Sequence, residues 1–271
     1  AEEVLAQLPE HDYNYGDARH YGASAFAEVA ADEFAPYRNK LAGFPASAQI
    51  RDDLPPGLMV SQGRLLIGRR TRIPAPRVDA LLQHEVGTHM VTYFNGQAQP
   101  LRLLAVGLAG YEALQEGLAV LAEFFVGGLQ VPRLRVLAAR VVAAHDLTEG
   151  ASFCDVFQRL HEGHSFPPDT AFSITMRTFR GGGIIKDVIY LRGLHELMGY
   201  LQRGGALEPL FAGKMALHHL PILEELEARG LLQPQPLRPL YLDRPATPAR
   251  LDRVRGGLTL VDLIAKRVEK A

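Results

Sequence analysis

The stretch that decides the fold runs from residue 77 to residue 94 and reads RVDALLQHEVGTHMVTYF. Two prolines precede it, and Asn95 and Gly96 follow it, so typical start and stop signals of a helix enclose the stretch. We therefore predict one helix over these residues. The centre of this helix is unusual, because His84 and His89 lie five positions apart in an otherwise apolar setting.

Residues 84–89, HEVGTH, resemble the HExxH helix of zinc enzymes with one residue added. In HExxH, two imidazoles hold the zinc ion and the glutamate acts on the water bound to it. On a regular α-helix, positions i and i+5 point about 140° apart, so the two rings would face different sides. One wider, π-type turn reduces that angle to about 50°, and Gly87 tolerates the distortion. We predict this wider turn; the alternative is one surface histidine and one core histidine that share no ligand.

Three glutamates on the next predicted helix, residues 101–126, are candidates for a third ligand. They share nearly one face of that helix, at positions Glu112, Glu116 and Glu123. The alternative is that this face is simply exposed to solvent. A catalytic zinc site normally has three protein ligands and a water molecule. We choose Glu116, because Gly117 beside it allows a close approach of the two helices. We expect another of these glutamates to orient an imidazole.

The composition narrows the possible classes of protein. The chain has 271 residues, of which 47% are hydrophobic and 22% charged, and its formal net charge is -1. This suits one globular domain and argues against a general binder of nucleic acid or of anionic membranes. Acidic residues interrupt the most apolar stretch, so we expect no membrane span. Cys154 is the only cysteine, which excludes a disulfide scaffold; we expect it to be buried and the protein to be cytoplasmic.

The remaining pattern predicts one domain over residues 1–271, without an internal boundary. We expect an α+β protein that is mainly helical, with a small β-hairpin around Ser61, Gln62 and Gly63 ahead of the histidine-bearing helix. The other predicted segments are an irregular lead-in over 1–22, helices over 23–41, 132–145, 187–203 and 258–269, and a proline-rich extended wrap over 230–257.

Three motifs carry a resemblance to a known family: HEVGTH (84–89), NGQAQPL (95–101) and QEGLAVLAEFF (115–125). Together they resemble the bacterial QEGLA-motif proteins, which are related to the microtubule-associated tyrosine carboxypeptidases. The similarity covers roughly residues 58–200, the motif-bearing catalytic core. The resemblance implies a zincin-like fold with one zinc ion per chain, held by His84, His89 and Glu116. Glu85 is then the general base. Family members often extend further at the N-terminus, so we expect this chain to be shortened.

The chemistry of a carboxypeptidase requires further groups. The terminal carboxylate of the substrate needs a cation, and Arg177, Arg180 and Lys186 cluster around a glycine triplet. Tyr190, one helical turn after Lys186, is a candidate donor to the oxyanion. We thus predict a zinc carboxypeptidase that releases an aromatic, tyrosine-like residue from a peptide or protein C-terminus, with no nucleic-acid or membrane partner.

Two other functions stay open. One is a non-catalytic regulatory module that binds peptide C-termini, although such a module has no need of Glu85. The other is a zinc endopeptidase, which would have no cation closing the cleft beyond the cleaved bond. In each case the predicted hairpin offers an edge strand that can hold a peptide in extended form. The sequence leaves the oligomeric state open.

Overall fold

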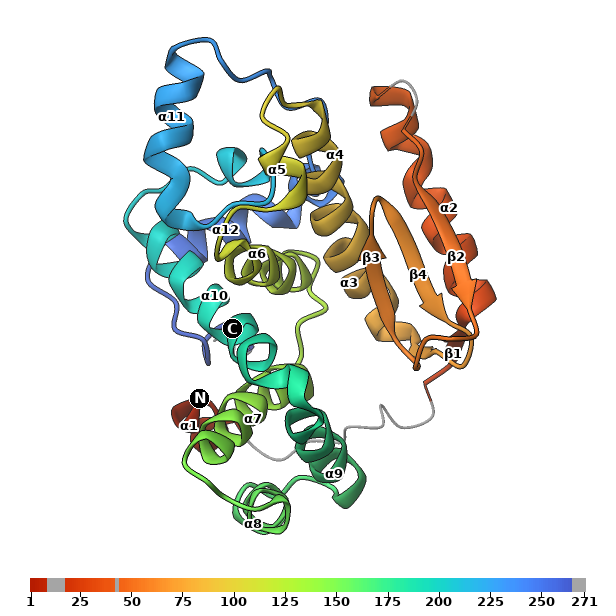
Figure 1. Cartoon of the computed structure of the whole chain (residues 1–271), viewed down its shortest axis with the longest axis vertical. Helices are drawn as coiled ribbons and strands as arrows, with labels where there is room; N and C mark the ends of the chain where they lie inside the picture. Colours follow the sequence, from red (N-terminus) through yellow and green to blue (C-terminus); the bar gives the residue numbers. More distant parts are fainter. Residues whose placement is uncertain (9–17, 42–43, 265–271) are drawn as a thin grey trace, which may run out of the picture.

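The computed structural model describes residues 1–8, 18–41 and 44–264, and for residues 181–185 it describes the backbone alone. Most of this part of the chain is helical, and its strands form two small sheets (Figure 1). The α+β class expected from the sequence is thereby confirmed. The sheets and helix α2 (Ala23–Lys40) lie on one side of the molecule, and most other helices lie on the other side (Figure 1). None of the described helices has the length and apolar character needed to cross a membrane.

The three-stranded sheet has a free edge strand. Its strands are β2 (Ser47–Arg51), β3 (Leu58–Ser61) and β4 (Arg64–Gly68), in the order β2-β4-β3. Strand β4 pairs in parallel with β2 and antiparallel with β3, so the predicted hairpin is confirmed. Gln62 and Gly63 form its turn with φ angles of 50° and 72°, as a tight two-residue turn requires. Strand β3 is left at the edge of the sheet.

The expectation of an irregular lead-in over residues 1–22 is wrong for the described part of that segment. Residues Glu2–Gln7 form helix α1, in which Val4 and Leu5 are buried. Residues His20–Gly22 form strand β1, which pairs antiparallel with β5 (Arg72–Pro74). A partner strand far along the chain decides this element, so local periodicity gave no sign of it.

Three helical segments follow β5 without interruption and carry both histidines. They are α3 (Ala75–His84), a π-helical segment (Glu85–Met90) and α4 (Val91–Ala98). The single helix predicted for residues 77–94 is confirmed, and so is the wider turn between the histidines. The π-helical segment contacts strand β3 on one side and the next long helix on the other.

The helix predicted over residues 101–126 is in fact two helices. Helix α5 (Leu103–Val106) ends at Gly107, whose φ is 124°, and α6 (Tyr111–Phe125) starts after Gly110, whose φ is 73°. Both angles belong to backbone conformations that favour glycine, so the chain turns sharply between the two helices. Helix α6 then runs through the centre of the molecule, and most of its side chains are buried (Figure 1).

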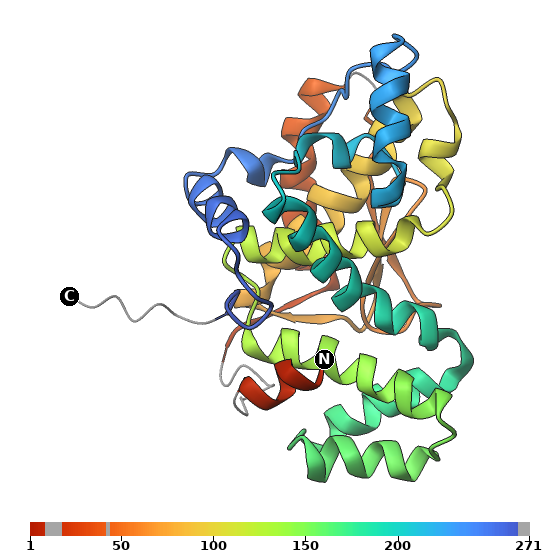
Figure 2. The same cartoon turned by 90° about the vertical axis from the view of Figure 1, so that its left-hand side faces the viewer.

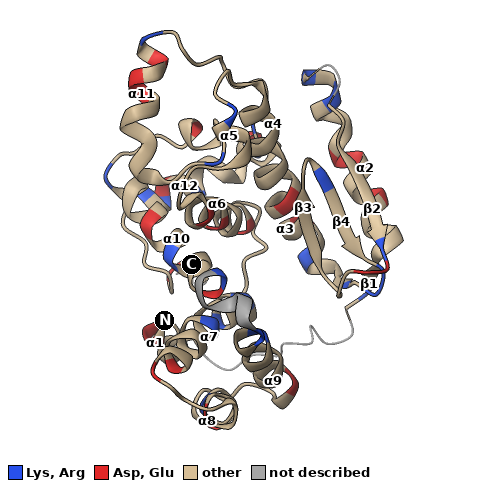
Figure 3. Cartoon of the chain, viewed as in Figure 1, with Lys and Arg blue, Asp and Glu red and all other residues tan. Residues whose placement is uncertain are grey.

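The remaining helices complete the fold around α6. They are α7 (Val131–Thr148), α8 (Phe153–Gln158), α9 (Pro168–Arg177), α10 (Gly183–Gln202), α11 (Leu220–Ala228) and α12 (Ala246–Arg255), with short π- or 3-10-helical turns at Arg159–Gly163, Thr178–Gly182, Glu208–Phe211, Leu217–His219 and Leu240–Asp243. Helix α1 packs on α7 (Figure 2). Cys154 in α8 is exposed, so the expectation of a buried cysteine is wrong. Acidic and basic residues are spread over both sides of the molecule (Figure 3).

The prediction of an extended chain over the proline-rich segment 230–257 is wrong for part of that segment, because it contains α12. Pro245 is the N-cap of this helix and Pro248 lies in its first turn, where a proline removes no helical hydrogen bond. The prolines therefore start the helix instead of preventing it. The final helix predicted over 258–269 is a series of turns as far as it is described, and its last residues lie outside the described part of the chain.

Two glycines let α6 and α10 pack at close range. A methyl group added to Gly193 of α10 would overlap the carbonyl oxygen of Ala113 in α6, and one added to Gly117 would lie 2.5 Å from the backbone of Gly193. The prediction that Gly117 serves the contact with the histidine-bearing helix is wrong, because Gly117 faces α10. The close approach to α3 is made instead by Gly128, just past the end of α6, against Ala80.

Candidate metal centre

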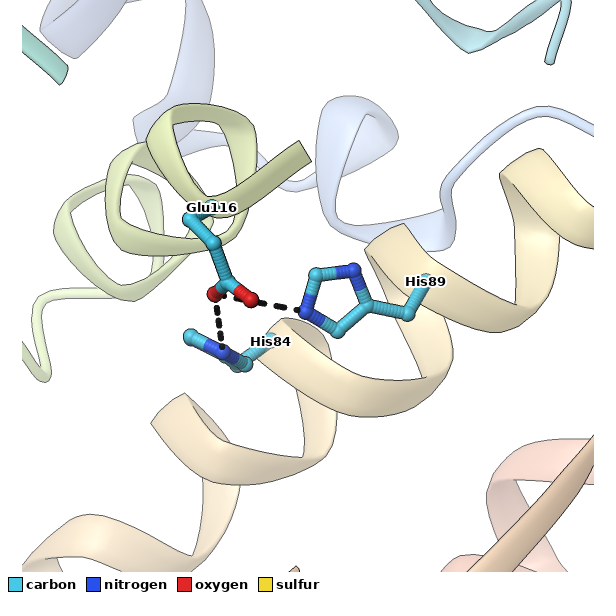
Figure 4. A group of neighbouring side chains, drawn as sticks. All are labelled: His84, His89 and Glu116. Atoms are coloured by element: carbon cyan, nitrogen blue, oxygen red, sulfur yellow. Dashed lines mark ion pairs between the residues drawn. The ribbon is translucent and has the colours of Figure 1, made fainter. Parts of the chain in front are cut away.

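Three side chains from three helical elements converge on one point (Figure 4). His84 ends α3, His89 lies in the π-helical segment, and Glu116 lies near the middle of α6. The Oε2 atom of Glu116 is 3.5 Å from His84 Nε2 and 3.7 Å from His89 Nε2. One possible ligand atom from each residue lies within 4.8 Å of the other two. The structure thus brings together the three residues that the sequence singled out.

The π-helical segment turns both imidazoles to the same side. Its wider turn is visible in the backbone, because the N–H of Val91 donates to the carbonyl of Val86, five residues earlier. Thr88 Oγ1 donates to the carbonyl of Gln83 at 3.1 Å, so this oxygen has a partner where the helix widens. The two histidine rings have centroids 5.0 Å apart and planes at 82°, and both Nε2 atoms face Glu116.

The donor set fits a metal ion. Two imidazole nitrogens and one carboxylate are typical protein ligands of a catalytic zinc site. The Oε2 atom of Glu116 is buried without a hydrogen-bond partner in the described part of the chain, which is costly unless a cation faces it. Around a tetrahedral ion with bonds of about 2.0–2.1 Å, neighbouring ligand atoms lie about 3.3 Å apart, close to the spacing between Glu116 and each histidine. The group could therefore hold a metal ion.

Glu123, two helical turns beyond Glu116 in α6, lies behind His84. Its Oε1 atom is 3.0 Å from His84 Nδ1, and its side chain is fully buried. Arg77 donates to Oε2 at 2.6 Å, and Arg133 donates to Oε1 at 3.1 Å. Burial raises the pKa of Glu123, but Arg133 and Arg77 outweigh burial and hold it well below its usual range. The ionised carboxylate accepts the Nδ1 proton of His84 and leaves Nε2 free for a metal ion.

His89 is oriented by a neutral group instead. Its Nδ1 lies 3.4 Å from Gln115 Oε1, and Thr92 Oγ1 donates to the same oxygen at 2.7 Å. The sequence analysis assigns no role to Gln115, although this residue directly precedes Glu116 in the sequence. The two histidines therefore differ in the charge of the group behind each of them.

The pKa of His84 reflects the two carboxylates on either side of its ring. Burial lowers this pKa, but contact with Glu116 and Glu123 outweighs burial and raises it to about 9. The pKa of Glu116 is raised by burial, yet His89 and His84 hold it well below its usual range. A proton and a metal ion compete for the same Nε2 atom, so metal affinity should fall as the pH is lowered.

A cavity of about 400 Å³ opens over this group. Glu85 follows the first histidine, is largely buried, and reaches the cavity without forming an ion pair within the described part of the chain. Of the four residues predicted to bind substrate, Arg177, Lys186 and Tyr190 line the cavity. Arg180 is exposed and is not among the lining residues, so the structure does not bring it to the site.

The three lining residues differ in how firmly they are held. Arg177 Nε donates to Asp187 Oδ1 at 2.5 Å, and the Asp187 side chain is fully buried. Lys186 is exposed. The Tyr190 ring is stacked on that of His84, with centroids 6.5 Å apart and planes at 20°. Burial raises the pKa of Tyr190, so its hydroxyl stays protonated and can donate a hydrogen bond.

Sequence reasoning missed two further polar residues of the cavity wall, Tyr111 and Lys214. Tyr111 opens the helix that carries Glu116, and its place at that helix start is a signal that could have found it. Lys214 lies in an irregular segment without any motif, so nothing in the local sequence pointed to it.

The fold and the site together define a mainly helical α+β protein with a His–His–Glu group that could hold a metal ion beside a cavity. A family model described as microtubule-associated tyrosine carboxypeptidase matches residues 1–258 of the chain. The chain therefore belongs to this family of carboxypeptidases, which are hydrolases, and the relationship expected from the motifs is confirmed. A comparison with curated proteins gives no match.

Proposed function

We propose that the protein is a zinc-dependent carboxypeptidase that releases an aromatic, tyrosine-like residue from the C-terminus of a peptide or protein. The observation that carries this proposal is the convergence of His84, His89 and Glu116 in one cavity beside Glu85. In the proposal, one zinc ion per chain is held by the first three residues, within a zincin-like fold. A cytoplasmic location and the absence of nucleic-acid and membrane partners stay predictions from the composition.

A bound zinc ion acts as a Lewis acid, which polarises the scissile carbonyl and makes a water molecule more acidic. Glu85 acts as the general base, because its carboxylate accepts the proton of the attacking water and then passes it to the leaving amine. Tyr190 donates its hydroxyl hydrogen to the carbonyl oxygen as negative charge develops there. Glu123 keeps the His84 ring in the orientation that this chemistry needs.

The end of the substrate chain is bound by the cations near Tyr190. Lys186 is exposed at the cavity and lies one helical turn before Tyr190 in α10. Arg177 uses its Nε for Asp187, so its terminal NH₂ groups stay available for a carboxylate. The edge strand β3, whose residues also line the cavity, supports binding of the peptide in extended form.

The test compares Glu85→Gln with the wild type at equal zinc content. We expect metal analysis to find about one zinc per chain in both proteins. Release of tyrosine from a short peptide should fall by about 10²–10⁴-fold in kcat, because glutamine cannot accept a proton at neutral pH. Glu162→Gln is a matched control, since Glu162 also follows a histidine but is exposed and outside the cavity. It should leave the rate unchanged.

Equal rates in the wild type and in Glu85→Gln would contradict the mechanism. A peptide with an amidated C-terminus separates the alternatives. A carboxypeptidase rejects it, because the cations near Tyr190 lose their carboxylate partner, whereas an endopeptidase cleaves it as well as the free peptide. Binding of free C-termini without any release would identify a regulatory module.

A further inference from the structure

A buried tyrosine from the C-terminal part of the chain packs against the π-helical segment that carries His89. Tyr241 lies in the 3-10-helical turn Leu240–Asp243, and its side chain is buried. A methyl group added to Gly87 would lie 2.9 Å from Cδ1 of the Tyr241 ring, so the ring packs against the backbone at Gly87. Neither Tyr241 nor Gly87 lines the cavity, and substrate binding therefore does not explain this contact.

The hydroxyl of Tyr241 completes a chain of hydrogen bonds that ends on the backbone of the widened turn. Thr88 Oγ1 donates to the carbonyl of Gln83 at 3.1 Å, and the Thr88 side chain is also hydrogen-bonded to that of Tyr241. A threonine hydroxyl has one hydrogen, so Tyr241 is the donor to Thr88. Both side chains are buried, and removing either hydroxyl would leave the other without this partner.

The segment around Tyr241 is fixed to the helices that precede the π-helical segment. The N–H of Leu240 donates to the hydroxyl oxygen of Tyr37 in α2 at 3.0 Å. Arg244 donates two hydrogen bonds to the carboxylate of Asp79 in α3, at 2.6 Å and 2.9 Å. Tyr241 is therefore held in a fixed position relative to α3, the helix that ends at the first histidine.

The contact between Tyr241 and Thr88 depends on the wider turn. If the turn relaxed to a regular α-helix, His89 would rotate by about 90° relative to His84, and Thr88 would rotate with it. Because Tyr241 is fixed to α3, Thr88 would then move away from the Tyr241 hydroxyl. A contact that exists in only one of two backbone conformations stabilises that conformation. Tyr241 thus favours the π-helical form of the turn.

We propose that Tyr241 is a positioning residue for the metal centre: by holding Thr88, it maintains the π-helical turn that directs His84 and His89 at one ion. This inference rests on the proposed function, which supplies the ion. It adds a residue that touches neither the ion nor the substrate and lies far along the chain from both histidines. The C-terminal part of the chain is thereby a component of the metal centre.

The experiment removes one hydroxyl at a time. The variants are Tyr241→Phe, Thr88→Val and, to retain the hydroxyl, Thr88→Ser. The control is Thr175→Val, because Thr175 is buried in α9 and donates to the carbonyl of Ala171 at 2.8 Å in an ordinary helical turn. Three quantities are measured beside the melting temperature: the Kd for zinc by chelator competition, the visible absorption spectrum of bound Co²⁺, and amide hydrogen exchange of residues 85–91 in the metal-free protein.

We expect Tyr241→Phe and Thr88→Val to weaken zinc binding about 10–100-fold, because the imidazoles lose their common direction. Both should also alter the Co²⁺ spectrum, which reports the coordination geometry, and should accelerate exchange of residues 85–91 about tenfold. The double variant should be no worse than Thr88→Val alone, since the two hydroxyls act through one chain of hydrogen bonds. Thr88→Ser should resemble the wild type, and Thr175→Val should lower only the melting temperature.

The inference is overturned if Tyr241→Phe and Thr88→Val lower the melting temperature as Thr175→Val does but leave the zinc Kd, the Co²⁺ spectrum and the exchange rates unchanged. Tyr241 would then be an ordinary core residue. A Thr88→Ser protein that behaves like Thr88→Val would also contradict it. If the wild type binds neither zinc nor Co²⁺, the proposed function fails. The exchange rates then decide on their own whether Tyr241 holds the turn, because they are measured without a metal ion.

Discussion

Replacing Glu123 with glutamine removes the buried carboxylate that pairs with Arg77 and Arg133 behind His84. The Glu123 side chain is 0% exposed, and those of Arg77 and Arg133 are 6% and 17% exposed. Glutamine has nearly the same shape, so the cost comes from the unbalanced guanidinium groups and not from a cavity. Removing one partner of a buried ion pair costs about 3–5 kcal/mol, and we expect the free energy of unfolding to fall by that much. The change also loosens His84, which should weaken metal binding about 10–100-fold.

Urea unfolding of the metal-free protein measures the stability loss, and competition with a zinc chelator measures the affinity. Against burial, Arg133 and Arg77 hold the pKa of Glu123 below its unfolded value, so the advantage of the wild type is complete above about pH 4.3 and shrinks as the pH falls below it. The control is Glu112→Gln, an exposed position on the same helix, which should change stability by less than about 0.5 kcal/mol. Adding Arg133→Met to Glu123→Gln should restore part of the loss, because one unbalanced charge is removed. If Glu123→Gln costs no more than Glu112→Gln in both measurements, the reasoning from buried charges is wrong.

Packing and site geometry lead to three more expected outcomes. Gly193→Ala should destabilise the protein by about 1–3 kcal/mol, because the added methyl group overlaps the carbonyl of Ala113. The control is Gly199→Ala on the same helix, whose methyl group meets only the end of a flexible arginine. Thermal unfolding compares the two variants, and equal melting temperatures would contradict the close helix contact. His89→Ala should lose most of its zinc, and chelation should lower the melting temperature of the wild type but not of this variant; full zinc content in the variant would remove His89 from the ligand set. Tyr190→Phe should lower kcat for tyrosine release about 10²-fold at unchanged zinc content, and an unchanged kcat would exclude Tyr190 as the oxyanion donor.

The convergence of the two histidines could be predicted from the sequence, because helix geometry determines the direction in which side chains at a given spacing point. Positions five apart do not converge on an α-helix, so His84 and His89 required either a wider turn or no shared ligand. The structure has the wider turn, as a π-helical segment. The glycine argument for Glu116 is wrong, because Gly117 faces α10 and not the histidine-bearing helix. What brings Glu116 to the histidines is the packing of α6 on α3 and on the π-helical segment.

Contacts between remote segments decided the features that the sequence did not reveal. Lys214 is placed by backbone bonds to Leu104 and Leu108, and strand β1 exists because β5 pairs with it. Neither relation leaves a periodic pattern in the local sequence. Proline content was ambiguous for another reason, because a proline is compatible both with extended chain and with the first turn of a helix. Pro245 and Pro248 take the second role in α12.

The charges around His84, His89 and Glu116 explain why these three side chains suit a divalent cation. Behind His84, the negative charge of Glu123 is offset by Arg77 and Arg133. At the cavity, Glu116 and Glu85 are paired with no lysine or arginine among the described residues. Two carboxylates therefore face the place where the imidazole nitrogens meet, and a doubly charged cation that displaces the histidine protons balances them. Without the two arginines, the buried Glu123 would take up a proton more readily and would be a poorer acceptor for the Nδ1 proton of His84. The two arginines, neither of which lines the cavity, thus keep Glu123 ionised behind His84.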